Sequence, residues 1–436
     1  MRSPSAVAAA LLATSATAEN WMGFNSGAVK TDNSAKFKAD WLQEFKTAQG
    51  LKGAPGTFNS VRLYTNIQSY SESDPIEAFE AAIETKTNLL LGIWTSGTTS
   101  IDKELTALEK AVAKYGDKFV DLVIGISIGS EDLYRDSATG RANKGGIGNG
   151  PEQIVKFIGD YKKKFADSKL GQVPVGHVDT WDVWPNSTNK AVIDAVDWVG
   201  LDEYPYYESG KGNSIEKSGQ RFDTAFNAAK AAIGGKPIWI TETGWPTDGP
   251  KWDEAQPSIE NAKYYWDEVG CRQLFNKVPT FWYNLRDSNG ENKQTFAITD
   301  NLSTTPKFDL SCPKTFKTPT GSGSSSSASG SATASGSATA SGTSSATGSA
   351  SPSGSGSPSS GSGSSGSGSS GSGSGSSGSN PASGSGSSGS NPASGSGSQA
   401  GSSGTPVPTA GAGNVQVFSA AFTAVVAIAV GVTALL

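Results

Sequence analysis

Two glutamates follow apolar runs, at positions where their carboxyl groups can do chemistry together. Glu131 follows the run 123–130, and Glu242 follows the run 238–241. Two carboxyl groups that converge on one cleft can cleave a glycosidic bond, because one protonates the leaving oxygen while the other attacks the anomeric carbon. A single glutamate at a strand end is more often part of a rim salt bridge. The hypothesis therefore depends on elements that bring the two together.

The two runs belong to a series of eight short apolar segments. Several are apolar without a break rather than alternating, as expected for strands that are covered on both faces. Strands are predicted at Trp21–Asn25, Ser60–Tyr64, Leu89–Trp94, Leu122–Ile128, Val173–Val178, Trp198–Leu201, Pro237–Thr241 and Thr280–Tyr283.

Helical patterns separate these strands, and several begin with signals typical of helix N-termini, such as Ser73-Asp74-Pro75. Helices are predicted at Ala35–Gln49, Pro75–Lys86, Asp102–Tyr115, Pro151–Phe165, Thr188–Ala195, Gly219–Ile233 and Pro257–Val269. Strands alternating with helices in this way predict an α/β fold, a (β/α)8 TIM barrel over residues 19–317. A doubly wound open sheet is the alternative, but no Gly-x-Gly-x-x-Gly motif follows the first strand.

In such a barrel, catalytic groups lie at the carboxyl ends of the strands. Strands four and seven stand nearly opposite each other, so we expect Glu131 and Glu242 to face one cleft from two sides. A separation of about 5–5.5 Å between the carboxyl groups would imply double displacement with retention of configuration. Burial and a like-charged neighbour would raise the pKa of the acid and keep it protonated.

The residues around Glu242 form a long motif, Glu-Thr-Gly-Trp-Pro-Thr-x-Gly, within residues 238–249. This stretch closely resembles the signature of glycoside hydrolase family 17, the β-1,3-glucanases. Val61-Arg62-Leu63-Tyr64 and Glu203-Tyr204-Pro205-Tyr206 are similar to that family as well. The resemblance spans the globular block and implies a β-1,3-glucan substrate, with Glu242 as the nucleophile and Glu131 as the general acid/base. No cofactor is expected.

One position departs from the family pattern. The family usually has Asn immediately before the acid/base glutamate, where this chain has Ser130. The Asn is thought to hydrogen-bond the sugar 2-hydroxyl, a contact that strengthens in the transition state. Serine has a shorter reach and a single hydroxyl. The substitution therefore bears on rate and linkage preference more than on the class of reaction.

Aromatic side chains near the strand ends are candidates for lining a sugar cleft, since flat rings suit the apolar faces of pyranose units. Trp245, beside the nucleophile, is the first candidate for sugar stacking, and Tyr64 is expected to hydrogen-bond Glu242. Packing in the core is at least as good an explanation for each ring taken singly. The predicted substrate-binding residues are Tyr64, Ser130, Tyr204, Trp245 and Trp282, with Trp94, Tyr206 and Tyr283 as further aromatic candidates.

Three other polar residues lie near predicted strand ends. Asp202 and Glu203 are interpreted as orienting groups in salt bridges within the site rather than as groups that react. His177, the single histidine, is interpreted as a structural or supporting residue, because neither hydrolytic step requires it.

Composition and cysteine count limit the other possibilities. The formal net charge is −5 and there is no basic run, which argues against nucleic-acid binding. One histidine and no Cys/His cluster leave no basis for a structural zinc site. Cys271 and Cys312 are expected to pair in an oxidising compartment. The sequons at Asn186 and Asn301 are predicted glycosylation sites.

The residues before the globular block have the pattern of an export signal. Arg2 is followed by the apolar stretch Ala6–Leu12 and by the small-residue cleavage site Ala16-Thr17-Ala18. Residues 1–18 are therefore predicted to be a signal peptide. A buried first helix is the alternative, but the apolar stretch is short.

The residues after the globular block divide into a stalk and a tail. Residues 318–410 are almost entirely Ser, Gly, Ala and Thr, and are predicted to be a disordered, O-glycosylated linker. Residues 411–436 have the small residues and apolar tail of a glycosylphosphatidylinositol (GPI) signal. Gly411 is the predicted attachment residue, with Gly413 and Asn414 as rivals. A membrane-spanning tail is the alternative, but no basic residue follows it.

Three functions are compatible with these patterns. The first is retaining endo-hydrolysis of β-1,3-glucan by a secreted, monomeric enzyme anchored at a fungal-type cell membrane and wall. The second is glucanosyl transfer, which uses the same Glu131 and Glu242 but passes the sugar to another glucan chain instead of water. The third is a non-catalytic glucan-binding wall protein, which two costly buried carboxyl groups argue against.

Overall fold

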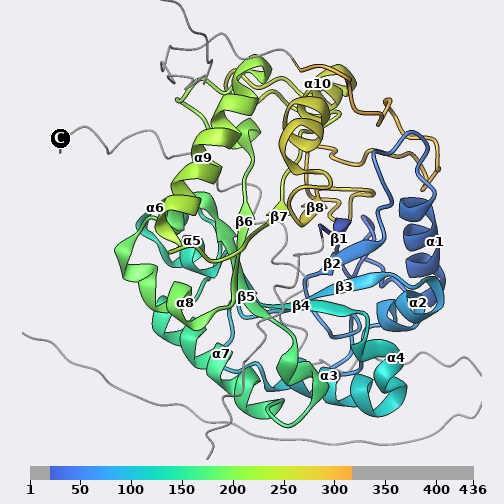
Figure 1. Cartoon of the computed structure of the whole chain (residues 1–436), viewed down its shortest axis with the longest axis vertical. Helices are drawn as coiled ribbons and strands as arrows, with labels where there is room; N and C mark the ends of the chain where they lie inside the picture. Colours follow the sequence, from blue (N-terminus) through green and yellow to red (C-terminus); the bar gives the residue numbers. More distant parts are fainter. Residues whose placement is uncertain (1–19, 317–436) are drawn as a thin grey trace, which may run out of the picture. The chain divides into compact units, whose positions relative to one another are not determined.

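The computed structural model describes residues 20–316, in which eight parallel strands form a closed barrel surrounded by helices (Figure 1). Each strand pairs with its neighbours in chain order, and β8 closes the barrel against β1. The prediction of a (β/α)8 barrel is confirmed. The predicted signal peptide, linker and GPI signal, including Gly411, lie outside the described residues.

All eight predicted strands are present, and their ends differ from the prediction by at most two residues. The strands are β1 (Met22–Ser26), β2 (Ser60–Leu63), β3 (Asn88–Ile93), β4 (Val123–Ser130), β5 (Val175–Thr180), β6 (Trp198–Asp202), β7 (Ile238–Glu242) and β8 (Thr280–Trp282). The carboxyl ends of β4, β5 and β6 extend beyond the apolar runs into polar residues, which apolar patterning alone does not reveal.

The seven predicted helices correspond to α1 (Lys38–Gln49), α2 (Ala78–Thr85), α3 (Asp102–Tyr115), α7 (Pro151–Lys164), α8 (Lys190–Ala195), α9 (Ser218–Ala232) and α10 (Ile259–Tyr265), which continues as a π-helix (Trp266–Leu274). Sequence patterns missed three short helices, α4 (Asp117–Val120), α5 (Asp132–Asp136) and α6 (Ala138–Ala142). Short 3-10 helices lie at Lys169–Gln172, Trp181–Val183, Ser187–Asn189, Pro205–Tyr207 and Ile215–Lys217. Of the missed helices, α5 matters most because it begins directly after Glu131.

The barrel interior is apolar near the amino ends of the strands. Trp198, the first residue of β6, and Trp239, the second residue of β7, stack there with ring centroids 4.3 Å apart. Two glycines make room for these rings, since a Cβ on Gly176 would lie within 2.3 Å of Trp198 and one on Gly125 within 2.9 Å of Trp239. Large rings at this end leave polar side chains at the carboxyl end, where barrel enzymes place their sites.

Outer helices cover the strands through apolar faces. In α7, the buried residues are Ile154, Phe157, Ile158 and Tyr161, at the spacing of one helical face. Pro151 occupies the first turn, where its missing N–H costs no helical hydrogen bond. None of the helices within residues 20–316 has both the length and the apolar character needed to cross a membrane.

A disulfide joins Cys271 of the π-helix to Cys312, as the sequence predicted. The two cysteines are 41 residues apart, so the bond restricts a long loop in the unfolded chain.

Replacing both cysteines with alanine is expected to lower the free energy of unfolding by about 3–4 kcal/mol. Urea denaturation of the two proteins measures the difference. Equal unfolding midpoints would contradict a stabilising role for the bond.

Candidate active site

The structure places Glu131 and Glu242 at the carboxyl end of the barrel. Glu131 directly follows β4, and Glu242 is the last residue of β7. Both are largely buried, with exposed fractions of 7% and 6%. Such burial of two carboxyl groups is costly unless their charges are compensated.

The carboxylate of Glu242 accepts three hydrogen bonds. Oε1 accepts one from Arg62 Nη1 at 2.6 Å and one from the Tyr64 hydroxyl at 2.7 Å. Oε2 accepts one from the Tyr204 hydroxyl at 2.7 Å. Burial, reinforced by the charge of Glu242, raises the pKa of both tyrosines well above the ordinary value, so both hydroxyls remain donors. Hydrogen bonds to a carboxylate are stronger than those between neutral groups, so these three contacts fix the position of the Glu242 side chain.

Arg62 connects the ends of the two catalytic strands. Its Nη2 donates to Ser130 Oγ at 2.9 Å, next to Glu131, while Nη1 donates to Glu242. Asn25 holds the guanidinium through a further hydrogen bond of 2.8 Å from Nη1 to Oδ1. Because the Ser130 oxygen accepts from Arg62, the hydroxyl hydrogen of Ser130 is available to a ligand.

Glu131 has an unusual backbone conformation and an environment that favours the protonated form of its carboxyl group. Its φ of 57° lies in the left-handed region, where non-glycine residues are uncommon and often functional. Burial raises the pKa of Glu131 to about 8, against the opposing charge of Arg135 and with a contribution from the charge of Glu242. Arg135 Nη2 lies 2.9 Å from Glu131 Oε2. The acid is therefore protonated at neutral pH.

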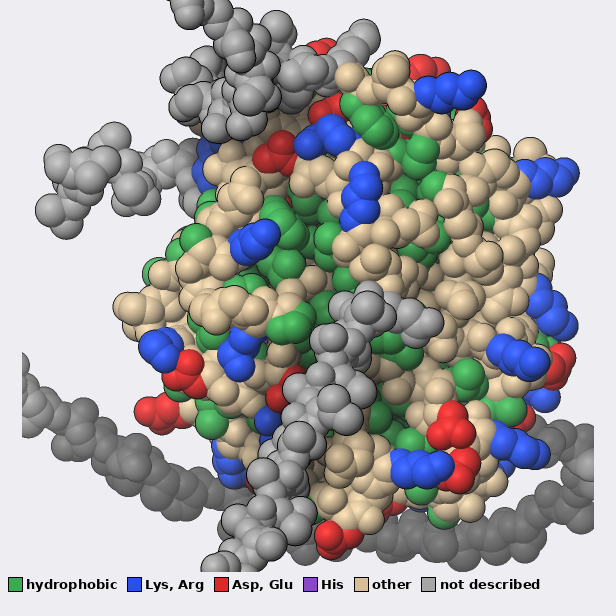
Figure 2. All heavy atoms as spheres, in the orientation of Figure 1, with side chains coloured by type: hydrophobic (Ala, Val, Ile, Leu, Met, Phe, Trp, Pro, Cys, Tyr) green, Lys and Arg blue, Asp and Glu red, His purple; other side chains and the backbone are tan. Residues whose placement is uncertain are grey.

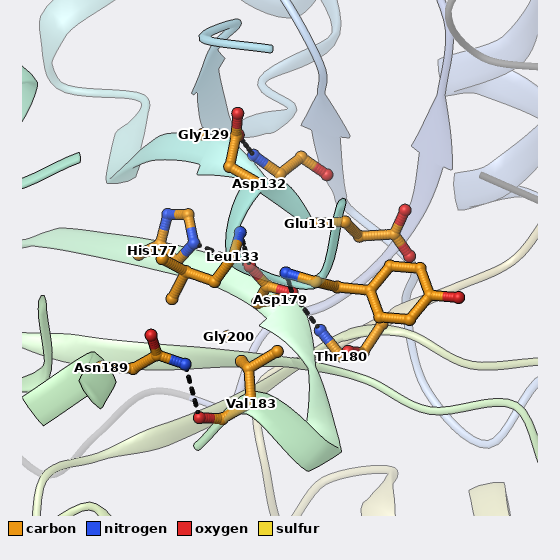
Figure 3. A network of polar contacts seen from close by, with 12 residues as sticks. Gly129, Glu131, Asp132, Leu133, His177, Asp179, Thr180, Val183, Asn189 and Gly200 are labelled. Carbon is orange, nitrogen blue, oxygen red and sulfur yellow. Dashed lines mark hydrogen bonds and ion pairs between the residues drawn. The ribbon is translucent and has the colours of Figure 1, made fainter. Parts of the chain in front are cut away.

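A charged pair behind Glu131 supports its backbone. Figure 3 shows Asp179 between His177 and the start of α5, with the Glu131 carboxyl group pointing away from them. Asp179 accepts hydrogen bonds from the backbone N–H groups of Leu133 and Tyr134, at 2.8 and 3.2 Å. An acceptor at the start of a helix satisfies amide groups that lack a helical partner. Asp179 thereby holds the turn that places Glu131 in the cleft.

His177 neutralises Asp179. Its Nε2 lies 3.0 Å from Asp179 Oδ2, and its Nδ1 lies 2.6 Å from the carbonyl oxygen of Ile128. Both nitrogens face acceptors, so the ring is suited to the doubly protonated form. Burial alone would lower the pKa of His177, but the hydrogen bond and charge of Asp179 raise it above the usual value. The interpretation of His177 as a supporting residue agrees with this placement.

His177→Gln is expected to reduce kcat roughly tenfold, because loss of one partner leaves Asp179 charged and unneutralised in the interior. The uncompensated charge of Asp179 also raises the pKa of Glu131 further, so the alkaline limb of the pH–activity profile moves to higher pH. Steady-state kinetics across pH measures both effects, with exposed Lys190→Gln as the control. An unmoved alkaline limb in His177→Gln would contradict this role.

The predicted stacking roles of two tryptophans are corrected by the structure. Trp245 is 2% exposed, packs against Tyr206 and Tyr265, and donates Nε1 to the Gln256 carbonyl oxygen at 3.0 Å. Trp282 is also 2% exposed and packs against Trp266 and Phe275. Both rings belong to the core between the barrel and its outer helices, so neither offers a face to a sugar.

The prediction for Trp282 was wrong because neighbouring residues on a strand face opposite sides. Trp282 points toward the helices, whereas Tyr283 packs edge-on against Tyr204, whose hydroxyl binds Glu242. Trp94 directly follows β3, with the Arg135 guanidinium 5.4 Å from its ring centroid. Tyr206 is fully buried.

Sequence reasoning missed several residues that position the site. Asn25, Arg135 and Asp179 were not predicted, and Arg62 appeared only within a motif. Arg135 had a usable signal, since it lies four residues after Glu131 and α5 brings it back to that carboxyl group. The salt bridges expected of Asp202 and Glu203 are not formed within residues 20–316; Asp202, the last residue of β6, instead accepts a hydrogen bond of 2.6 Å from Thr241 Oγ1.

Other predicted sites lie elsewhere on the domain. Asn186 and Asn301 are exposed, and their glycosylation stays a prediction. No cluster of His, Cys, Asp or Glu within residues 20–316 has an arrangement suited to a metal ion. On the face shown in Figure 2, lysine and arginine side chains are interspersed with acidic ones.

Residues 23–299 match the family described as the BtgE/BtgC glycoside hydrolase domain. The chain belongs to this family. It is 50% identical over 303 residues to the probable glucan endo-1,3-beta-glucosidase eglC of Aspergillus oryzae, covering 69% of this chain and 64% of that protein. A glucan 1,3-beta-glucosidase of Schizosaccharomyces pombe is 28% identical over 280 residues, covering 62% of this chain and 79% of that protein. The chain thus spans just under two thirds of the Aspergillus relative.

A solved structure shares the fold of this glycoside hydrolase domain. The glycoside hydrolase family 17 beta-1,3-glucanosyltransferase of Rhizomucor miehei superposes with a TM-score of 0.54 at 22% identity. The match covers 67% of this chain and 98% of that chain. At this level of identity, the likeness supports the barrel architecture.

Proposed function

We propose that this chain is a retaining endo-β-1,3-glucanase that uses Glu242 as nucleophile and Glu131 as general acid/base. The observation that carries the proposal is the contrast between the two carboxyl groups. Arg62, Tyr64 and Tyr204 all donate hydrogen bonds to the carboxyl oxygens of Glu242, whereas burial raises the pKa of Glu131 to about 8. A carboxyl group surrounded by donors and a second one with a raised pKa meet the requirement of a retaining glycosidase for a nucleophile and a proton donor.

The reaction follows from these states. Glu131 gives its proton to the glycosidic oxygen as an oxygen of Glu242 bonds to the anomeric carbon and the leaving sugar departs. The Glu131 carboxylate then takes a proton from water, the water oxygen bonds to the anomeric carbon, and the bond to Glu242 breaks. Glu131 ends protonated and Glu242 ionised, as at the start.

Hydrogen bonding around the nucleophile supports a role for Ser130 in this cycle. Ser130 directly precedes Glu131, and Arg62 donates hydrogen bonds to both the Ser130 hydroxyl and Glu242. The hydroxyl hydrogen of Ser130 can therefore be donated to a sugar hydroxyl. Such a contact would take the place of the hydrogen bond made by the longer Asn side chain that the family usually has at this position. The names of the Aspergillus and Schizosaccharomyces relatives support a β-1,3-linked glucan as the substrate.

The setting of the enzyme is part of the proposal. A signal peptide at residues 1–18, a glycosylated linker at 318–410 and a GPI signal at 411–436 would export the domain and hold it at the outer face of the cell membrane, within reach of the wall. The protein acts there as a monomer that remodels wall glucan. Mass spectrometry of the anchored peptide, expected to end at Gly411, tests the attachment.

Product sizes test the catalytic proposal. Purified protein is incubated with reduced linear β-1,3-glucan oligomers, and products are followed over time. Products that are all shorter than the substrate would support hydrolysis. Products longer than the substrate would instead support glucanosyl transfer, and untouched oligomers would contradict catalysis on this linkage.

A further inference from the structure

Tyr64, one of the donors to the nucleophile, lies just beyond the end of its strand. β2 ends at Leu63, and the Tyr64 hydroxyl donates to Glu242 Oε1 at 2.7 Å. The chain passes close to β3 here, since a Cβ on Gly92 would lie 2.3 Å from the carbonyl oxygen of Leu63 and 2.9 Å from the Tyr64 Cα atom. Because the strand pairing stops before Tyr64, the position of its hydroxyl depends on what holds the residues that follow.

A buried carboxyl group on an outer helix holds those residues. Glu104 belongs to the first turn of α3, which lies outside the barrel (Figure 1), and it is 5% exposed. Its Oε1 accepts a hydrogen bond from the Thr65 hydroxyl, and its Oε2 accepts two from Asn66, at 2.8 Å from the backbone nitrogen and 3.0 Å from Nδ2. Asn66 Nδ2 also donates to the carbonyl oxygen of Gly92 at 2.9 Å. The loop after Tyr64 is thereby fixed to α3 and to β3.

Burial of the Glu104 carboxyl group is unfavourable for the fold. Its partners are hydrogen-bond donors, and it forms no ion pair with a lysine or arginine within residues 20–316. Burial raises the pKa of Glu104 to about 7, while hydrogen bonds from Thr65, from Asn66 and from the backbone of Trp94 favour its ionised form. An apolar side chain of similar volume would avoid this desolvation. A carboxyl group kept in such a place indicates a task other than stability.

We propose that Glu104 is a positioning residue, which fixes the loop after β2 so that the Tyr64 hydroxyl stays in contact with Glu242. The inference rests on the proposed function, in which Glu242 attacks the anomeric carbon and must be held in one orientation. A misplacement of about 1 Å near a reacting group can lower the rate about 100-fold. A shift of that size would also break the hydrogen bond from Tyr64 to Oε1.

Variants at position 104 separate positioning from packing. Glu104→Leu keeps a side chain of similar size but removes both acceptors, so kcat on β-1,3-glucan oligomers is expected to fall about tenfold, with KM changed by less than about twofold. Glu104→Gln keeps one carbonyl oxygen to accept from Asn66, and its amide can donate to the Thr65 hydroxyl, so most of the activity is expected to return. Glu109→Leu, at an exposed position of the same helix, is the control and should leave kcat unchanged.

A double variant shows whether the effect passes through Tyr64. Tyr64→Phe removes the hydroxyl that Glu104 is proposed to position. In this background, Glu104→Leu is expected to lower kcat by less than about twofold, because residues that act through one contact are not additive. A tenfold loss in both backgrounds would mean that Glu104 supports the fold in general, and it would overturn the positioning role.

Thr65→Val provides a second variant in case Glu104→Leu does not fold. It removes one of the same contacts without changing α3, and kcat is expected to fall about threefold, but not in the Tyr64→Phe background. An unchanged kcat in an active Glu104→Leu, or equal falls for Thr65→Val in both backgrounds, would overturn the positioning role while leaving the proposed function intact. An unmodified protein that cleaves no β-1,3-glucan oligomer would overturn both.

Discussion

Glu242→Gln is expected to lower kcat by on the order of 10⁵-fold on β-1,3-glucan oligomers. Glutamine occupies nearly the same volume, but its amide is a poor nucleophile, so the glycosyl-enzyme does not form. Arg62 and Tyr64 also lose the charge that they stabilise at Oε1. Initial rates of reducing-end release measure the effect.

Glu254→Gln is the matched control for this substitution. Glu254 is exposed and pairs with Lys217 at 3.4 Å. Exposed ion pairs contribute little to stability, so this substitution removes a carboxylate without weakening the fold. It is expected to leave kcat unchanged. Activity of Glu242→Gln within tenfold of the unmodified protein would exclude Glu242 as the nucleophile.

A second large effect is expected in the pH dependence of kcat/KM. Glu131 must be protonated to donate, and its pKa is raised to about 8, mainly by burial. Activity should therefore be lost as pH rises through about 8, falling about tenfold for each further pH unit. A carboxyl group with an ordinary pKa would lose its proton near pH 4 instead.

Glu131→Gln identifies the group responsible for this limb. Its activity on oligomers is expected to fall on the order of 10²–10⁴-fold, and the residual activity should lack the decline near pH 8. A substrate with an activated leaving group, such as a dinitrophenyl glycoside, should lose less activity because its departure needs little protonation. Retention of the alkaline limb in Glu131→Gln would assign it to another group.

The sequence was sufficient to predict the barrel and its two reacting carboxyl groups. Buried parallel strands produce unbroken apolar runs, and strand order places β4 opposite β7, so Glu131 and Glu242 could be brought together without coordinates. The motif at 242–249 assigned their roles by resemblance. The disulfide between Cys271 and Cys312 could be predicted because the chain has no other cysteine.

Side-chain direction and supporting contacts were not predictable in the same way. Trp245 and Trp282 are aromatic and lie near strand ends, but both rings are buried in the core, and the apolar pattern does not distinguish a ring in the core from one in the cleft. The pair of His177 and Asp179 acts through backbone amides of α5, a helix too short to leave a periodic pattern.

Trapping the covalent intermediate tests the central claim most directly. A 2-deoxy-2-fluoro-β-laminaribiosyl fluoride slows breakdown of the glycosyl-enzyme, which is then digested and mapped by mass spectrometry. The proposed mechanism predicts a single labelled peptide with the sugar attached to Glu242. A label on Glu131 or on any other residue, or no label on a protein that cleaves β-1,3-glucan oligomers, would contradict it.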